Sequence, residues 1–133
     1  MGKTLAEKIL SLRSGTKAVT GSIIIAEVSL VFFQDTTGPL ALRQFQAAGF
    51  EHPSASTRAA FFMDHAAPSP NRELSNDHSF IRSFAHKNGS LLYDVGDGVC
   101  HQIVAESLAS PGDLILGTDS HTVTAGGMGA FAC

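Results

Sequence analysis

Acidic and histidine side chains that could carry acid–base chemistry recur at four places along the chain. Asp64 and His65 are adjacent, and Asp119, Ser120 and His121 form the densest group. An Asp beside a His can hold the imidazole in one tautomer and keep it protonated, which makes that His a general acid. The set also includes Asp35 and His101, and the neutral Gln34 directly precedes Asp35. These residue types predict a proton-transfer site, although Asp64 and His65 need a bend to act together, since neighbours on a strand face opposite ways.

Neutral donors near these groups indicate an anionic ligand. Gln34 and Ser120 carry side-chain N–H and O–H groups that suit a carboxylate. Gly98 and the glycine-rich stretch 126–129 allow backbone N–H groups to approach an anion, especially at the start of a helix. The sequence therefore favours a ligand with carboxylate groups.

Four short runs are expected to form the strands that position these residues. They are β-branched or apolar and cover residues 22–33, 59–63, 90–93 and 114–117. Each run leads into one of the polar groups, the third through a turn before His101. In open α/β sheets, ligands lie outside the carboxyl ends of the strands. We therefore expect the four groups to meet at one edge of a sheet.

Helices are expected between these strands. Thr4 and Glu7 have the spacing of a capping box, and Gly15 would end that first helix. Pro39 suits the first turn of a second helix, and Asn76 is expected to cap a third. The second helix is expected to end at Gly49 and the third at Asn88-Gly89. A further helix is expected over 101–108, and another is expected to begin in the glycine-rich stretch near Cys133. The alternation predicts a three-layer α/β/α fold with a mainly parallel sheet.

Composition restricts the kind of protein this can be. An apolar fraction of 44% with 16% charged residues predicts one folded domain over residues 1–133. A net charge of −3 argues against a nucleic-acid partner. No apolar run reaches the roughly 18 residues of a membrane helix, and the N-terminus lacks a signal core, so a cytoplasmic location is expected. Cys100 and Cys133 lack CxxC spacing, which suggests neither a disulfide framework nor a zinc site.

Several segments together resemble one enzyme family. Gly-Thr-Asp-Ser-His-Thr at 117–122, followed by Ala-Gly-Gly-Met-Gly-Ala at 125–130, is similar to a signature of aconitase-type hydro-lyases. Shorter similarities occur at 33–39, 62–65 and 98–102, and the opening residues 2–9 are typical of dehydratase large subunits. The chain thus resembles the aconitase and 3-isopropylmalate dehydratase large subunit family. We expect it to be the N-terminal portion of such a domain, truncated at its C-terminal end.

The resemblance implies a reaction and roles for named residues. The family dehydrates and rehydrates a hydroxy di- or tricarboxylic acid, such as citrate, isocitrate or isopropylmalate, with a [4Fe–4S] cluster. By resemblance, Asp64 and His65 protonate the departing hydroxyl, while His101 and His121 orient it and Asp119 pairs with a His. The residues implied to bind substrate are Gln34, Asp119, Ser120 and His121.

Part of the family's machinery is not found in this sequence. Neither Cys100 nor Cys133 matches the cluster ligands, which follow later in the family, so no metal ligand is predicted here. The arginines that clamp the substrate and the serine base also belong to later regions or to a second subunit. We therefore expect this chain alone to be inactive and to need the remainder of a large subunit, and possibly a small swivel subunit. Thr124 replaces an Asn of aconitases, which leaves the substrate open.

Other interpretations of these residues remain open. A carboxylate-binding module without catalysis would use the same polar groups. Gly127-x-Gly129-x-x-Ala132 loosely fits a dinucleotide fingerprint, but it begins too far after the strand that ends at Gly117. Asp119-x-His121 could serve a zinc hydrolase, but it lacks a third ligand at convincing spacing. Asp35 and Asp119-Ser120 could instead be helix caps with no direct role in a site. We interpret His52, His78 and His86 as surface residues.

Overall fold

The structure, a computed structural model, describes residues 2–133 and is built around one parallel sheet. The strands follow the order β3-β2-β1-β4-β5, and every neighbouring pair is parallel. Their bounds are Leu30–Gln34 for β1, Arg58–Phe62 for β2, Leu91–Tyr93 for β3, Leu114–Gly117 for β4 and Phe131–Ala132 for β5. From β1 the chain first adds β2 and β3 on one side of the sheet. It then returns and adds β4 and β5 on the other side of β1. This reversal creates a topological switch point between the carboxyl ends of β1 and β4.

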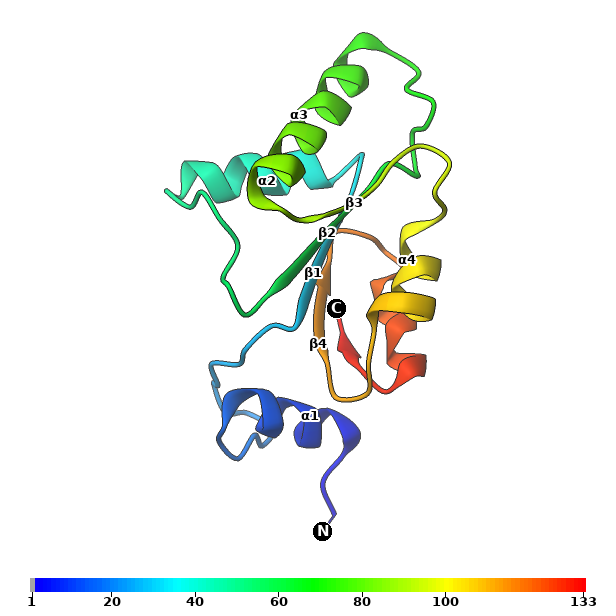
Figure 1. Cartoon of the computed structure of the whole chain (residues 1–133). Coiled ribbons are helices and arrows are strands. Elements are labelled where there is room, and N and C mark those ends of the chain that lie inside the picture. Colours follow the sequence, from blue (N-terminus) through cyan, green and yellow to red (C-terminus); the bar gives the residue numbers. More distant parts are fainter. Residues whose placement is uncertain (1) are drawn as a thin grey trace.

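Helical segments cover the two faces of the sheet and make three layers (Figure 1). Helices α2 (Gly38–Ala47) and α3 (Arg72–Asn88) lie on one face. On the other face lie α4 (Cys100–Ile103), the π-helical turn η1 (Val104–Leu108) and the 3₁₀ helix η2 (Thr122–Met128). The first helix, α1 (Leu5–Ser14), packs beside β4 and β5. The predicted three-layer α/β class is confirmed.

The two central strands are apolar on both faces because both faces are covered. Phe32 and Phe62 meet edge to face, 6.0 Å between ring centroids, beneath α4 and η1. On the opposite face, Phe33 stacks on Phe61 with 5.0 Å between ring centroids. Phe84 of α3 packs against Phe61 there. Such continuous apolar strands are typical of buried parallel sheets.

The predicted helix signals mostly act as expected. Thr4 and Glu7 form a reciprocal capping box at the start of α1, with Thr4 N–H donating to the Glu7 carboxylate at 2.8 Å. Gly15 and Gly89 end α1 and α3 in the left-handed conformation, at φ angles of 65° and 60°. Pro39 lies in the first turn of α2.

The strand predicted over residues 22–33 is wrong for most of its length. Only Leu30 onward pairs in the sheet, while Ile23 and Ile25 are 99% and 92% exposed. Residues 22–28 belong to no helix or strand, and Glu27 N–H donates to the carbonyl of Arg13 rather than to a strand. Strand propensity depends on packing against neighbours, and this run has no neighbouring strand among residues 2–133.

Three further boundaries differ from the sequence prediction. Asn71, not Asn76, caps α3 by accepting the Leu74 N–H at 2.9 Å, so the helix starts one turn earlier. The helix predicted over 101–108 is a short α-helix that continues as a π-helical turn. The glycine-rich stretch forms the 3₁₀ helix η2 and then β5, so β4 is not the last strand.

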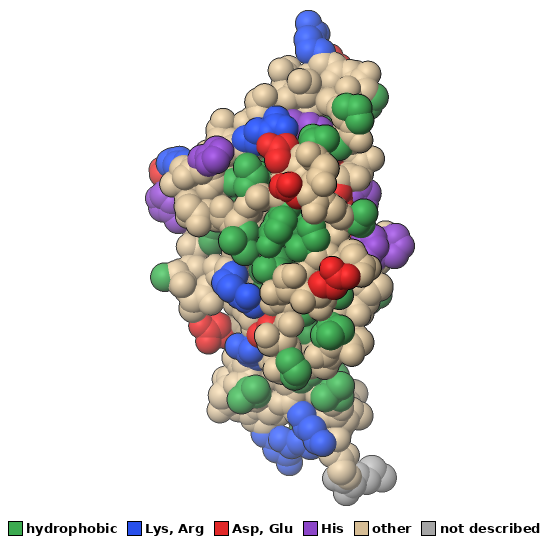
Figure 2. Space-filling model, turned by 45° about the vertical axis from the view of Figure 1, so that its right-hand side comes forward, with side chains coloured by type: hydrophobic (Ala, Val, Ile, Leu, Met, Phe, Trp, Pro, Cys, Tyr) green, Lys and Arg blue, Asp and Glu red, His purple; other side chains and the backbone are tan. Residues whose placement is uncertain are grey.

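Hydrophobic side chains also reach the surface. They gather near the middle of the face drawn in Figure 2. Several large ones on α1 and α2 are well exposed, including Leu12 at 69% and Leu40 at 64%. None of the helices formed by residues 2–133 has both the length and the apolar character that a membrane crossing requires.

Gly117, the last residue of β4, allows the strand to approach its neighbours closely. An added Cβ would lie 2.6 Å from the Phe32 ring and closer still to Thr122 Oγ1. We expect Gly117→Ala to lower the free energy of unfolding by about 1–3 kcal/mol, as overpacking of a core does. Urea unfolding measures this, with Gly126→Ala as the matched control because its Cβ would meet nothing within 4 Å. Equal midpoints for both variants would contradict the prediction.

Candidate active site

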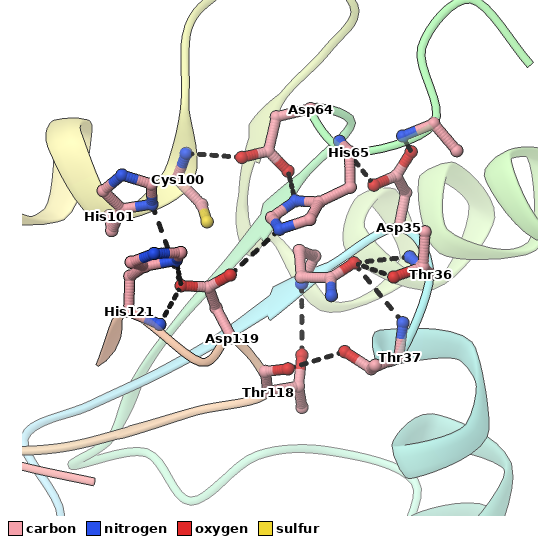
Figure 3. Close-up of polar contacts among 12 residues, drawn as sticks. Asp35, Thr36, Thr37, Asp64, His65, Cys100, His101, Thr118, Asp119 and His121 are labelled. Atoms are coloured by element: carbon pink, nitrogen blue, oxygen red, sulfur yellow. Dashed lines mark hydrogen bonds and ion pairs between the residues drawn. The ribbon is translucent and has the colours of Figure 1, made fainter. Parts of the chain in front are cut away.

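The carboxyl ends of three neighbouring strands bring the predicted polar residues together. Gln34 ends β1, Asp64 and His65 follow β2, and Asp119 follows β4 across the switch point. The loop after β3 leads into α4, which carries His101 toward the same group (Figure 3). Thr118, just after β4, is bonded to β1 and to the turn that follows it: Gln34 N–H donates to Thr118 Oγ1 at 3.2 Å, and Thr37 Oγ1 donates to the Thr118 carbonyl at 2.7 Å. The predicted gathering at one sheet edge is therefore present.

His65 stands at the centre of the group, between two carboxylates. Its Nδ1 lies 2.9 Å from Asp64 Oδ1, and its Nε2 lies 3.0 Å from Asp119 Oδ1. The bend that the sequence required follows β2, and Asp64 is fixed there because its Oδ2 accepts the Cys100 N–H at 2.6 Å. Both carboxylates are buried, whereas the His65 side chain is 32% exposed. The imidazole is thus the part of the group that a ligand can reach.

The charge around His65 favours its protonated form. Burial alone would lower the pKa of His65, but the hydrogen bond and the charge of Asp64 outweigh burial. The charges of Asp119 and Asp35 add to this effect, so the pKa of His65 lies above its ordinary value. A raised pKa keeps more of the imidazole protonated near neutral pH, as a general acid requires.

Asp119 organises the two remaining histidines. Its Oδ2 accepts the backbone N–H of His121 at 2.6 Å and lies 3.6 Å from His121 Nδ1 and 3.7 Å from His101 Nδ1. The two imidazole rings lie beside each other, with centroids 4.7 Å apart. All three predicted site histidines therefore lie around one buried carboxylate.

Asp35 anchors the segment that carries His65. Its fully buried carboxylate accepts the backbone N–H groups of His65 at 2.9 Å and Ala66 at 3.0 Å. Burial raises the pKa of Asp35, but these two bonds and a third from His78 outweigh it, so the pKa lies below its ordinary value. Asp35 is not the cap of α2, whose first flanking residue is Thr37. The cap considered for Asp35 is therefore wrong, and a direct role for Asp35 stays a prediction.

His78 was missed by sequence reasoning. It is only 3% exposed, and its Nε2 lies 2.9 Å from Asp35 Oδ2, so its interpretation as a surface residue is wrong. His78 lies three residues before Ile81 and seven before Ala85, both buried on the inner face of α3. This helical spacing was the available signal that His78 faces the core.

Gln34 and Ser120 occupy different positions relative to the group. The side-chain oxygen of Gln34 accepts from Thr36 N–H at 2.5 Å and Thr36 Oγ1 at 2.7 Å, which shapes the turn after β1. Its amide N–H groups form no hydrogen bond within residues 2–133 and are free to donate to a ligand. Ser120 is exposed, with its Oγ 3.3 Å from His121 Nδ1. Their proposed contact with a carboxylate remains a prediction.

Two hollows bear on where a ligand could lie. One of about 290 Å³ lies at the carboxyl edge beside Asp64 and is lined by Met63, Gly96 and Gly98, among others. A larger one of about 490 Å³ lies at the opposite edge, where β2 and β3 begin, and is lined by none of the predicted site residues. We therefore place the candidate site at the carboxyl edge because of the residues that lie there, and not because of the size of the hollow.

The cysteines do not fit an iron–sulfur cluster. Such a cluster is held by several thiolates. Cys100 is fully buried, and burial and the nearby Asp64 charge raise the pKa of its thiol, while Cys133 is exposed. These are the only two cysteines in the chain. The residues present fit acid–base chemistry and not the binding of a cluster within this chain.

Comparison with known proteins agrees with this geometry. Residues 7–133 match the model of the aconitase family (aconitate hydratase). The chain is 53% identical to the 3-isopropylmalate dehydratase large subunit 2 of Archaeoglobus fulgidus over 132 residues, which are 99% of this chain and 32% of that protein. It is 49% identical to the 3-isopropylmalate dehydratase large subunit 1 of Thermotoga maritima over 131 residues, which are 98% of this chain and 31% of that protein. It is 47% identical to the 3-isopropylmalate dehydratase large subunit of Elusimicrobium minutum over 132 residues, which are 99% of this chain and 32% of that protein. The chain thus spans about a third of the length of the curated relatives it matches.

Proposed function

The chain belongs to the aconitase family, and from this premise we propose that it supplies the acid side of a hydro-lyase active site. The proposed reaction removes water from, or adds it to, a hydroxy di- or tricarboxylic acid of the isopropylmalate type. The observation that supports this most is His65, accessible and placed between the buried carboxylates of Asp64 and Asp119.

In the proposed dehydration, His65 acts on the departing hydroxyl. The imidazolium gives its Nε2 proton to the hydroxyl, the C–O bond breaks, and water leaves. Asp64 holds Nδ1, so the ring keeps its orientation as the proton moves. In the reverse direction, neutral His65 takes a proton from water. The base that removes the substrate C–H proton is proposed to lie outside these 133 residues.

The carboxylate groups of the substrate need separate donors. The free amide N–H groups of Gln34 and the exposed hydroxyl of Ser120 are proposed to donate to them. His101 and His121, held near Asp119, are proposed to orient the hydroxyl or its water.

The remaining parts of the machinery are proposed to come from elsewhere. A [4Fe–4S] cluster would be held by thiolates outside this chain, because Cys100 and Cys133 do not fit it. The relatives are named large subunits, so a small subunit is a proposed partner. A cytoplasmic location remains a prediction.

An exchange experiment tests the proposed function. Residues 2–133 replace the matching segment of the Archaeoglobus fulgidus large subunit 2, 53% identical, and the chimera is assayed with its small subunit on 3-isopropylmalate. We expect kcat/KM within about tenfold of the parent, a change of under about 1.4 kcal/mol. We also expect no turnover from the chain alone. A folded chimera without activity would refute the acid role, and turnover by the chain alone would refute the need for other groups.

A further inference from the structure

A buried histidine that has no part in the proposed mechanism lies behind the segment that carries His65. His78 faces the core from α3 and is 3% exposed, three residues before the fully buried Ile81. Its Nε2 lies 2.9 Å from Asp35 Oδ2. Burial of a polar imidazole on an apolar helix face is costly unless a hydrogen bond offsets it. The bond to Asp35 is therefore the contact from which the role of His78 has to be inferred.

Asp35 connects His78 to the proposed acid. Its Oδ1 accepts the backbone N–H of His65 at 2.9 Å, and its Oδ2 accepts the Ala66 N–H at 3.0 Å and also meets the His78 ring (Figure 3). The Asp35 side chain has no exposed area, so water does not compete for its oxygens. The carboxylate can turn only by breaking one of these bonds. The donor from α3 thus fixes the carboxylate that holds the backbone at His65.

The hydrogen in the contact with Asp35 belongs to His78. Burial raises the pKa of Asp35, but its hydrogen bonds outweigh burial, so the carboxyl group is ionised near neutral pH and can only accept. His78 Nε2 is therefore the donor. One further carboxylate is close enough to respond to His78: the bond from Arg82 lowers the pKa of Asp94 most, and the charge of His78 adds a smaller effect.

The imidazole of His65 is sensitive to the position of its backbone. Its Nδ1 lies 2.9 Å from Asp64 Oδ1 and its Nε2 lies 3.0 Å from Asp119 Oδ1, so the ring is held from two sides. A backbone shift of about 1 Å lengthens at least one of these contacts, and a misplacement of that size can cost roughly 10²-fold in rate. The bond from Asp64 is also what outweighs burial in raising the pKa of His65.

We propose that His78 is a positioning residue for His65. Its Nε2–H fixes the carboxylate of Asp35, and that carboxylate holds the backbone from which the His65 imidazole reaches its two acidic partners. His78 does not line the hollow at the carboxyl edge and touches no ligand there. The position of the imidazole is a property of this chain, whereas its consequence for catalysis rests on the proposed function.

Nuclear magnetic resonance of the 133-residue chain tests the position without any assay of turnover. The imidazole Cε1–H signal of His65 is assigned by its loss in His65→Gln and is then titrated with pH. His78→Gln keeps an amide N–H near the place of Nε2, whereas the amide of His78→Asn ends short of Asp35. We expect the pKa of His65 to stay raised in His78→Gln and to move down toward its ordinary value in His78→Asn.

The chimeric enzyme tests the consequence for the reaction. His78→Asn is expected to lower kcat by roughly 10²-fold, the cost of a misplacement of about 1 Å, with a smaller change in KM. His78→Gln is expected to stay within about threefold of the parent. A general acid must be protonated, so dehydration declines as the pH rises through the pKa of His65, and this decline is expected at lower pH in His78→Asn.

Ile81→Val is the matched control, because it removes a buried carbon from the same face of α3 and leaves the bonds of Asp35 intact. We expect it to change neither the pKa of His65 nor kcat. His78→Leu suits the apolar helix face and replaces His78→Asn if circular dichroism shows that variant unfolded. An unshifted pKa of His65 in a folded variant without the donor, or an equal effect of Ile81→Val, would overturn the positioning role. A shifted pKa with unchanged kcat would support that role and count against His65 as the acid.

Discussion

Replacing His65 with Gln in the chimeric enzyme is expected to lower kcat by roughly 10²–10⁴-fold, the usual contribution of a positioned acid–base group. The imidazole is the accessible member of the group and the one able to give a proton, because Asp64 and Asp119 are buried beside it. Gln keeps a side chain of similar length that can hydrogen-bond but cannot transfer a proton at neutral pH. Steady-state kinetics on 3-isopropylmalate measure the effect, and kcat is expected to fall more than KM rises.

The matched control for this substitution is His86→Gln. His86 is also a histidine of this chain, but it lies exposed in the last turn of α3 and has no contact with the group in Figure 3. Its substitution is expected to leave kcat within about twofold, a change of about 0.4 kcal/mol. If His65→Gln also stays within that range in a folded chimera, His65 is not the acid.

The gathering of the site could be predicted because it depends on order along the chain. Polar groups followed four apolar runs, and parallel strands bring such ends to one edge. The strand ends at Phe62 and Gly117 agree with that expectation closely enough to place Asp64, His65 and Asp119 together. Errors of a few residues in the strand bounds do not matter, since the polar groups lie beyond the ends.

Features that depend on packing between distant elements could not be predicted in the same way. The run at 22–29 has strand propensity, but whether a neighbouring strand exists is a property of the whole sheet. Asp35 and His78 are 43 residues apart and meet only because α3 packs across the sheet. The buried placement of Cys100 beside Asp119 likewise requires α4 to fold over the carboxyl edge.

The pair of Asp35 and His78 leads to the second large effect, which concerns stability. Asp35→Ala is expected to lower the free energy of unfolding by about 3 kcal/mol, because three N–H groups lose their acceptor and each such loss costs about 1–3 kcal/mol. These groups belong to His65, Ala66 and His78. Solvent can replace part of the loss at His65, which is near the surface, but not at the buried His78. Urea unfolding of the 133-residue chain measures the change, with an unaltered slope indicating a native-state effect.

The isosteric variant Asp35→Asn separates charge from shape. Its single amide oxygen can keep at most two of the three bonds, those from Ala66 and His78 that share one oxygen of Asp35, so we expect a smaller loss than with Ala. The pKa of Asp35 is depressed in the folded chain, so its charge stabilises the fold above the ordinary pKa of 3.8. That stability is lost as the pH falls from there through the folded value. The unsubstituted chain should therefore lose more stability than Asp35→Asn on acidification below about pH 5. Parallel acid profiles for the two chains, or an Ala variant within about 0.5 kcal/mol of the unsubstituted chain, would show that Asp35 does not anchor the His65 segment.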